Sequence, residues 1–154
     1  DKGHIMHDTF ASSRLFEGLP ESVKQDIYEA GEILPAKADE VIIEEGAQNA
    51  QMYLLLKGRF KVSLPDRPDR LGAVTLGYRG PGDLLGEYSL LDGLPAAATV
   101  TSQAPGLLFR ISHDSLQTLL AASPDVSSVV YRNMLGYLVA QLRAQDQEFD
   151  SLLV

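Results

Sequence analysis

The chain has 154 residues, enough for one domain with its own hydrophobic core. Its residues are 45% hydrophobic and 22% charged, which is ordinary for a globular protein, and no apolar run approaches the roughly 20 residues of a membrane span. The net charge of -8 and the scattered basic residues argue against direct nucleic acid binding, because a nucleic acid partner presents a phosphate backbone that must be neutralised.

The cysteine content and the N-terminal residues bear on the location of the protein and on the limits of its domain. Cysteine is absent, which excludes disulfides and thiolate chemistry. The first residues lack the charged and then apolar segments of a secretory signal, so we expect a cytoplasmic location. We interpret residues 1–7 as an expression scar or a disordered terminus, and residues 8–154 as a single domain.

The first expected element is an N-terminal helix within residues 13–30. Pro20 is typical of a helix start and Gly31 of a helix end. Apolar residues recur at helical spacing and predict one buried face: Leu19, Val23 and Ile27.

Between about residues 32 and 112 the hydrophobic period changes to two, and glycines separate short runs. We predict strands in the runs 32–37, 40–46, 51–64, 71–80, 83–91, 97–103 and 106–112. Segment 64–72 predicts a hairpin tip, since Pro65 and Pro68 cannot donate ladder hydrogen bonds. Many short strands at even spacing favour an antiparallel β-roll, a jelly-roll-like barrel, flanked by helices.

Helical periodicity returns over about residues 113–150. A first helix is expected to begin at Ser112 and end before Pro124, and a long second helix to begin at Pro124. The long helix carries an apolar face: Val126, Val130, Met134, Tyr137, Leu138, Leu142, Phe149 and Leu152. A face of this length predicts a homodimer through the C-terminal helix; alternatively, its first half folds back onto the roll.

Enzymatic chemistry finds little support in the sequence. A metal site in a roll needs histidines and carboxylates on strands, and none of the three histidines, His4, His7 and His113, falls on a predicted strand. The residues of "SHDS", 112–115, are adjacent in the chain and form a helix cap rather than a catalytic relay. We therefore expect a protein that is not an enzyme, with no catalytic residues, no metal and no cofactor.

The order of these features resembles the cyclic nucleotide-binding domain. The matching stretches are "LFEGLP", "YLLLKGRFKV", "PGDLLGEYSLLDGLPAAATV" and "LFRISHDSLQTLL", followed by the long helix. The family serves in bacterial transcription regulators, in regulatory subunits of cAMP-dependent kinase and in gated ion channels. The resemblance covers nearly the whole chain from about residue 15, and it implies a β-roll that senses a cyclic nucleotide such as cAMP.

Residues 82–100 resemble the phosphate-binding cassette of that family. The resemblance implies that Gly86 lets the backbone approach the ligand and that Glu87 accepts a hydrogen bond from the ribose 2′-hydroxyl. It also implies a short helix whose amides face the cyclic phosphate, at Tyr88, Ser89 and Leu90. Two side chains are expected to pack this helix onto the barrel: Leu91 and Leu94.

One part of the cassette departs from the family pattern. Where the family usually has an Arg, then a small residue and Ala, this chain has Ala96, Ala97 and Ala98. Removing one charged partner from a buried pair costs roughly 3–5 kcal/mol, so we expect weak or altered cyclic nucleotide binding. Arg79 and Arg110 lie on other strands, and the sequence does not place either of them in the site.

Two functions from different classes stay open. The first is a non-enzymatic sensor that couples a degenerate cassette to the C-terminal helix. The second is a ligand-independent interaction or dimerisation module that keeps only the fold. Titration with cAMP and cGMP, beside an Ala96→Arg variant, distinguishes the two.

Overall fold

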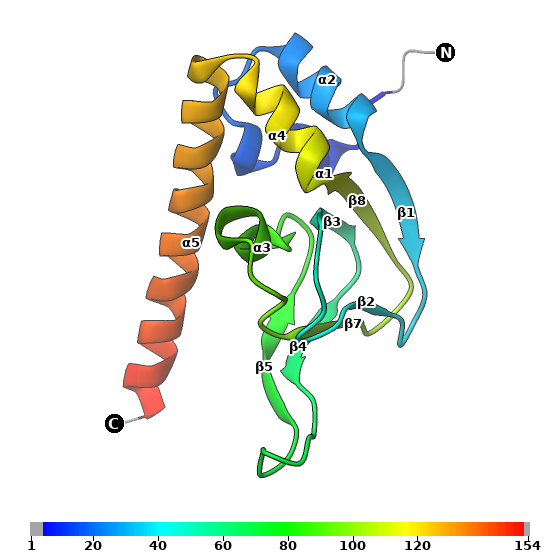
Figure 1. Cartoon of the computed structure of the whole chain (residues 1–154), viewed down its shortest axis with the longest axis vertical. Helices are drawn as coiled ribbons and strands as arrows, with labels where there is room; N and C mark the ends of the chain where they lie inside the picture. The colour runs from blue at the N-terminus through cyan, green and yellow to red at the C-terminus, as the bar shows by residue number, and fades with distance from the viewer. Residues whose placement is uncertain (1–4, 153–154) are drawn as a thin grey trace.

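Two antiparallel sheets form the centre of the computed structural model, which describes residues 5–152 (Figure 1). The elements in chain order are α1 (Asp8–Ala11), η1 (Arg14–Phe16), α2 (Glu21–Ala30), β1 (Glu32–Ala36), β2 (Val41–Ile43), β3 (Gln51–Lys57), β4 (Phe60–Leu64), β5 (Val74–Arg79), β6 (Leu84–Leu85), α3 (Glu87–Asp92), β7 (Thr99–Ser102), β8 (Gly106–Ser112), α4 (His113–Ala121) and α5 (Pro124–Leu152).

The expected scar at residues 1–7 overlaps the described chain only in part. Residues 1–4 lie outside the described residues. Met6 packs against the core, and the ring Nδ1 of His7 accepts a hydrogen bond from the Thr9 amide at 3.1 Å, which caps α1. Residues 6 and 7 therefore contact the folded domain.

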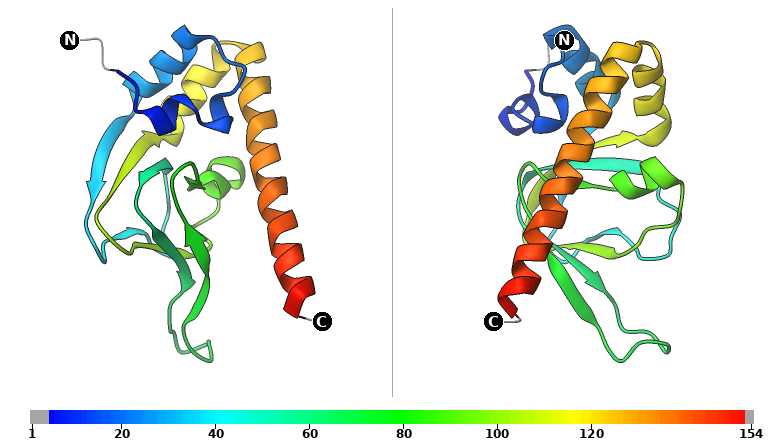
Figure 2. Two further views of the ribbon diagram at one scale, coloured as in Figure 1. Left: turned by 180° about the vertical axis from the view of Figure 1, so that it is seen from behind. Right: turned by 90° about the vertical axis from the view of Figure 1, so that its left-hand side faces the viewer.

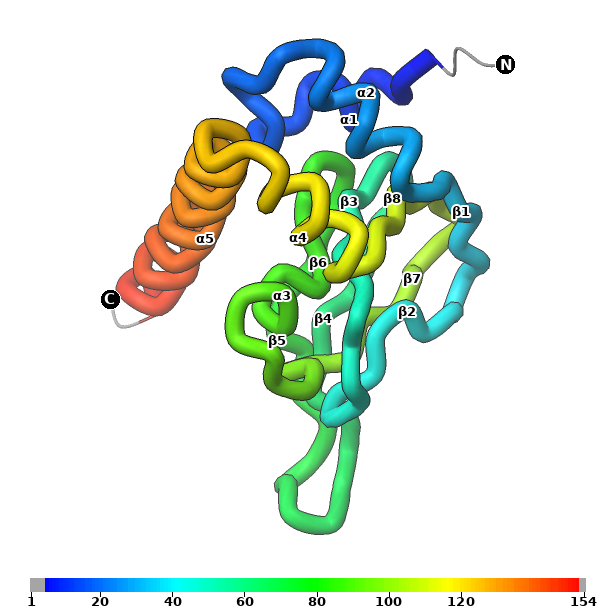
Figure 3. The backbone as a smooth tube through the Cα atoms, turned by 45° about the horizontal axis from the view of Figure 1, so that its top comes forward, coloured from blue at the N-terminus to red at the C-terminus, as the bar shows by residue number. Residues whose placement is uncertain are grey.

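The sheets confirm the antiparallel roll. One has the strand order β1-β8-β3-β6 and the other β2-β7-β4-β5, and every pairing is antiparallel. The predicted run 51–64 forms two strands, because the chain turns at Gly58, whose φ of 105° is readily adopted only by glycine. The β4–β5 hairpin extends away from the end of the molecule that carries α1, α2 and α4 (Figures 1 and 3).

Helices α1, α2 and α4 gather at one end of the sheets, and α5 runs from there along one side of the molecule, while α3 lies beside β3 (Figures 1 and 2). The hydroxyl of Ser112 accepts a hydrogen bond from the Ser115 amide at 3.0 Å, which caps α4. Pro124 is the first residue of α5, where its missing N–H costs nothing. Both predicted helix starts are confirmed.

The buried apolar residues form two clusters. The inter-sheet cluster lies between the sheets and consists of Ala36, Ile43, Tyr53, Leu55, Phe60, Leu85, Val100 and Leu108. The larger cluster lies between the helices and the β3–β8 sheet, and includes Phe10, Phe16, Ile27, Phe109, Leu116 and Met134. Two residues of the cassette contact the inter-sheet cluster: Leu85 belongs to it and Ala96 packs against it.

The strand predicted over residues 83–91 is wrong for most of its length. Only β6 is extended, because Gly86 adopts φ 80° and turns the chain into α3. The resemblance predicted this short helix correctly, but not its packing. Leu90 is buried, while Leu91 is 47% exposed because a helix of this length presents only one face to the roll. Leu94 lies beyond the end of α3, after Gly93, and is 60% exposed.

The first half of α5 folds back onto its own chain. Val130, Met134 and Tyr137 are buried there. The side-chain amide of Asn133 donates hydrogen bonds of 2.9 Å to the carbonyls of Leu15 and Glu17. The alternative of fold-back is therefore correct for this half, and these residues are not available to a partner.

Candidate functional site

A cavity of about 180 Å³ lies between the inter-sheet cluster, α3 and α5. Its apolar wall comes from both sheets, with Ile43, Val62, Leu84 and Val100 among its residues. All seven residues predicted for the site line it: Gly86, Glu87, Tyr88, Ser89, Ala96, Ala97 and Ala98. The structure thus brings the predicted set together, and a role in ligand binding stays a prediction.

Gly86 joins β6 to α3 at a place where no side chain fits. A Cβ built on its backbone would overlap the carbonyl oxygen of Gln51 and lie 2.7 Å from Nδ2 of Asn49. The Gly86 carbonyl accepts a hydrogen bond from Nε2 of His113 at 3.1 Å, which identifies that nitrogen as the protonated one because a carbonyl only accepts. The turn is therefore held from β3 and from α4.

Glu87 is a buried carboxyl on the cavity wall. Its side chain belongs to a residue only 6% exposed, and no described residue forms an ion pair with it. Burial raises the pKa of Glu87 to about 7; a backbone hydrogen bond and the charge of Arg79 act in the opposite direction, and Asp83 adds to the rise. The carboxyl is therefore divided between its neutral and charged forms near neutral pH.

Ala96, the residue at which the resemblance leads us to expect an arginine, is held by backbone contacts. Its amide donates to the carbonyl of Ala47 at 2.9 Å, and its carbonyl accepts from the amide of Gly46 at 2.8 Å. Its side chain packs against the inter-sheet cluster. Nearby, the hydroxyl of Ser89 donates to the Leu94 carbonyl at 2.8 Å and closes the turn after α3.

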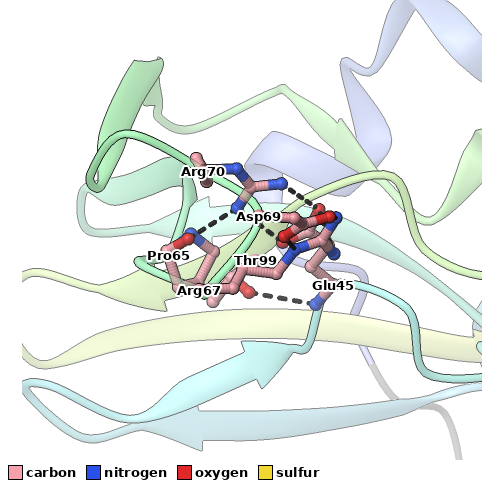
Figure 4. Close-up of polar contacts among 6 residues, drawn as sticks. All are labelled: Glu45, Pro65, Arg67, Asp69, Arg70 and Thr99. Carbon is pink, nitrogen blue, oxygen red and sulfur yellow. Dashed lines mark hydrogen bonds and ion pairs between the residues drawn. The ribbon is translucent and has the colours of Figure 1, made fainter.

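The β2–β3 loop that holds Ala96 is itself fastened to the hairpin tip (Figure 4). The guanidinium of Arg70 donates to both carboxylate oxygens of Glu45, at 2.8 and 3.0 Å, and Arg67 adds a contact of 3.4 Å. The hydrogen bonds from Arg70 have the largest effect on the pKa of Glu45, and together with the charges of Arg70 and Arg67 they lower it. The Glu45 amide donates to Oγ1 of Thr99 at 2.9 Å, so one residue links the loop, the hairpin and β7.

Tyr137 connects α5 to the strand that leads into the cassette. Its hydroxyl accepts hydrogen bonds from the Leu84 amide at 3.1 Å and from Nε2 of Gln141 at 2.6 Å. It also lies 3.4 Å from Oδ1 of Asp83, to which it donates. Burial raises the pKa of Tyr137, so the hydroxyl keeps its proton and remains able to donate.

Four polar lining residues were missed as site residues by the sequence analysis: Asn49 before β3, Arg79 on β5, and Gln141 and Gln145 on α5. The two glutamines follow Tyr137 at intervals of four along α5, a helical spacing that could have assigned all three to one face. Arg79 was named only as a residue of another strand, because no local pattern indicates which way it turns. Arg110, the other candidate cation, pairs with Glu32 on β1 instead.

A family model of the cyclic nucleotide-binding domain matches residues 33–123, which run from the second residue of β1 past the end of α4 and include the whole cassette. The chain belongs to the cyclic nucleotide-binding domain family. It is 31% identical over 127 residues to a cyclic nucleotide-gated potassium channel of Rhizobium etli, a match that covers 81% of this chain and 33% of the channel. The chain thus spans about a third of that relative's length.

Other members of the family place the same domain in different contexts. A CRP-like cAMP-activated global transcriptional regulator of Mycobacterium tuberculosis is 22% identical over 96% of this chain and 63% of its own length. Among solved structures, the Thermus thermophilus catabolite activator protein has a TM-score of 0.72 and 26% identity, over 91% of this chain and 63% of that one. A cyclic nucleotide-binding domain of Methylobacillus flagellatus has a TM-score of 0.79 at 24% identity, over 96% and 80% of the two chains, and shows the common fold.

Proposed function

We propose that this chain is a non-enzymatic regulatory domain that binds a cyclic nucleotide weakly, through a cassette that has lost its arginine. The observation that supports the proposal most is the meeting of Gly86, Glu87 and Ala96 on one cavity. The glycine and the acid keep the pattern expected for the family, whereas the alanine removes the cation that would face the cyclic phosphate.

The balance of charges explains why the binding should be weak. A buried anion that loses its charged partner is destabilised by roughly 3–5 kcal/mol, which corresponds to about two to four orders of magnitude in affinity. Protonation of Glu87 offsets part of this cost, since its pKa of about 7 leaves much of the carboxyl neutral near pH 7. We therefore expect measurable binding that is far weaker than with an arginine at position 96.

The proposed output is a shift of α5. Tyr137 joins α5 to Asp83 and to the Leu84 amide, directly before the cassette, and Gln141 and Gln145 line the cavity from the same helix. A ligand that contacts these groups differently in two positions of α5 would favour one position over the other. The cassette and the helix would then be coupled.

The proposal is tested by calorimetric titration of the chain with cAMP and cGMP, beside the Ala96→Arg variant. We expect weak binding by the unchanged chain and at least tenfold tighter binding of cAMP by the variant, because the guanidinium restores a bidentate partner for the phosphate. Ala121→Arg is the matched control, since it adds the same side chain at an exposed position on α4. Failure of both cyclic nucleotides to bind either the chain or Ala96→Arg would reject the proposal.

A second candidate function is a ligand-independent dimerisation module. It is favoured by exposed apolar residues that follow α5 at intervals of three, four and seven: Leu135, Val139, Leu142 and Phe149. This spacing is that of a coiled-coil seam. Under this alternative the domain would associate equally well with and without cyclic nucleotide.

A further inference from the structure

Arg79 lies at the end of β5, on the wall of the same cavity as Glu87 and Ala96. The direction of its side chain follows from an irregularity in the pairing of β4 with β5. The register shift between Val62 and Ser63 leaves Leu76 as an extra residue of β5, so Leu76 and Arg79, three positions apart, both line the cavity. A bulge of this kind re-aims side chains beside binding sites.

The guanidinium of Arg79 uses only part of its hydrogen-bonding capacity within the described residues. Its Nη1 donates to the carbonyl oxygen of Tyr78 at 3.0 Å, and no carboxylate within residues 5–152 forms an ion pair with it. An arginine carries five N–H donors, so most of them are not used by this contact. Its positive charge nevertheless acts on Glu87, since it offsets part of the rise in pKa that burial causes there.

The other arginines of the roll are engaged elsewhere. Arg67 and Arg70 pair with Glu45 at the hairpin tip (Figure 4). Arg110 pairs with Glu32, and Arg59 lies over the ring of Tyr78 at 4.0 Å. Among the described residues that line the cavity, Arg79 is the one basic side chain.

We propose that Arg79 is the cation that receives the anionic phosphate of the ligand, in place of the arginine absent at position 96. The inference rests on the proposed function of cyclic nucleotide binding. Residue 96 leads into β7 and Arg79 ends β5, and these strands flank β4 in the same sheet. The phosphate is therefore contacted from the edge strand of the sheet instead of from the cassette itself.

The test is a double-mutant cycle measured by calorimetry with cAMP, using Arg79→Gln in the unchanged chain and in the Ala96→Arg background. We expect Arg79→Gln to weaken binding at least tenfold in the unchanged chain and less than threefold in the Ala96→Arg background, where a second cation is present. Arg59→Gln is the control, because it removes the same charge from a residue that does not line the cavity, and it should leave the affinity within twofold.

The outcomes separate this inference from the proposed function. If Arg79→Gln binds cAMP as tightly as the unchanged chain, or if only chains with Ala96→Arg bind at all, the role of Arg79 is rejected and the cyclic nucleotide site stands. If no chain in the cycle binds, the proposed function is rejected with it. Thermal melting verifies folding, and an NMR titration of the Glu87 carboxyl should show a higher pKa in Arg79→Gln, because a favourable charge is lost.

Discussion

Glu87 is the residue whose environment differs most from that of an ordinary glutamate. Burial raises its pKa from 4.5 to about 7, and the groups around it come from three elements: Arg79 on β5, Asp83 before β6 and Tyr137 on α5. In the folded chain this carboxyl therefore keeps its proton over a pH range in which the unfolded chain has already lost it. Protein stability and anion binding should both depend on that proton.

We expect the free energy of unfolding to fall as the pH rises from about 5 to 7, and to change little from this cause above pH 7. The stabilising contribution of the protonated Glu87 is fully present below the pKa of 4.5 of the unfolded chain and is lost as the pH passes the folded pKa of about 7. The difference between these two pKa values corresponds to about 3 kcal/mol of unfolding free energy. Urea unfolding at several pH values measures it. Glu87→Gln should remove this slope and be the more stable protein at pH 8, and an unchanged slope in that variant would contradict the assignment.

The residues of the site differ in how far the sequence could predict them. Gly86, Glu87 and Ala96 were found because they lie together in one stretch whose order resembles the cassette. Arg79 could not be assigned, because its direction depends on one extra residue in β5 relative to β4. The wrong expectation for Leu91 has a similar cause, since the orientation of a short helix is fixed by its packing and not by its hydrophobicity.

At the scale of elements, the contact between α5 and β6 is the link that joins the cavity to the long helix. The Leu84 amide is buried and finds its hydrogen-bond acceptor in the hydroxyl of Tyr137 instead of in a neighbouring strand. Gln141, one turn further along α5, donates to the same hydroxyl. A single phenolic oxygen thus satisfies donors from two elements.

Tyr137→Phe should destabilise the domain by about 1–3 kcal/mol, because it leaves the buried Leu84 amide without its acceptor. Thermal or urea unfolding gives the magnitude. The variant should also uncouple α5 from the cassette, which is measured as faster hydrogen exchange in residues 137–152. Tyr131→Phe, at a half-buried position earlier on α5, is the control. Equal stability of Tyr137→Phe and the unchanged chain would show that the link is not needed.

The elements themselves were predicted best where a backbone constraint marks their ends. Ser112 and Pro124 gave the starts of α4 and α5, since a hydroxyl cap and a proline have few alternative places in a helix. Alternation failed over residues 83–91, where a two-residue strand and a short helix share the same apolar content. Only the glycine at position 86 separates them, through its positive φ.

At the scale of the whole molecule, two faces of α5 have different surroundings. The face with Val130, Met134 and Tyr137 is buried in the domain, whereas another face is 46–65% exposed and carries Leu135, Val139, Leu142 and Phe149. The sequence left two alternatives for the face with Val130 and Met134, a partner chain or the domain itself, and the second is correct because the domain's own residues bury this face. The available surface lies on the adjacent side of the helix.

We predict that the chain dimerises through the exposed residues of α5. Sedimentation equilibrium should show dimers at micromolar concentration, and Leu142→Glu should shift them to monomers because it places a charge in the apolar seam. Ala140→Glu adds the same charge at an exposed position off the seam and should leave the dimer intact. A monomer at high micromolar concentration would contradict the prediction.

The binding of cAMP at the cassette is tested most directly by ¹H–¹⁵N NMR spectra of the unchanged chain, recorded as cAMP is added. We expect the amide signals of Gly86, Glu87 and Ser89 and the side-chain signal of Arg79 to shift together and saturate, with a dissociation constant above about 1 µM. Signals from the hairpin tip around Arg70 should stay in place and serve as the internal control. If the cassette signals do not move at millimolar cAMP, or if the shifts fall on another surface, the chain does not use this cavity for a cyclic nucleotide.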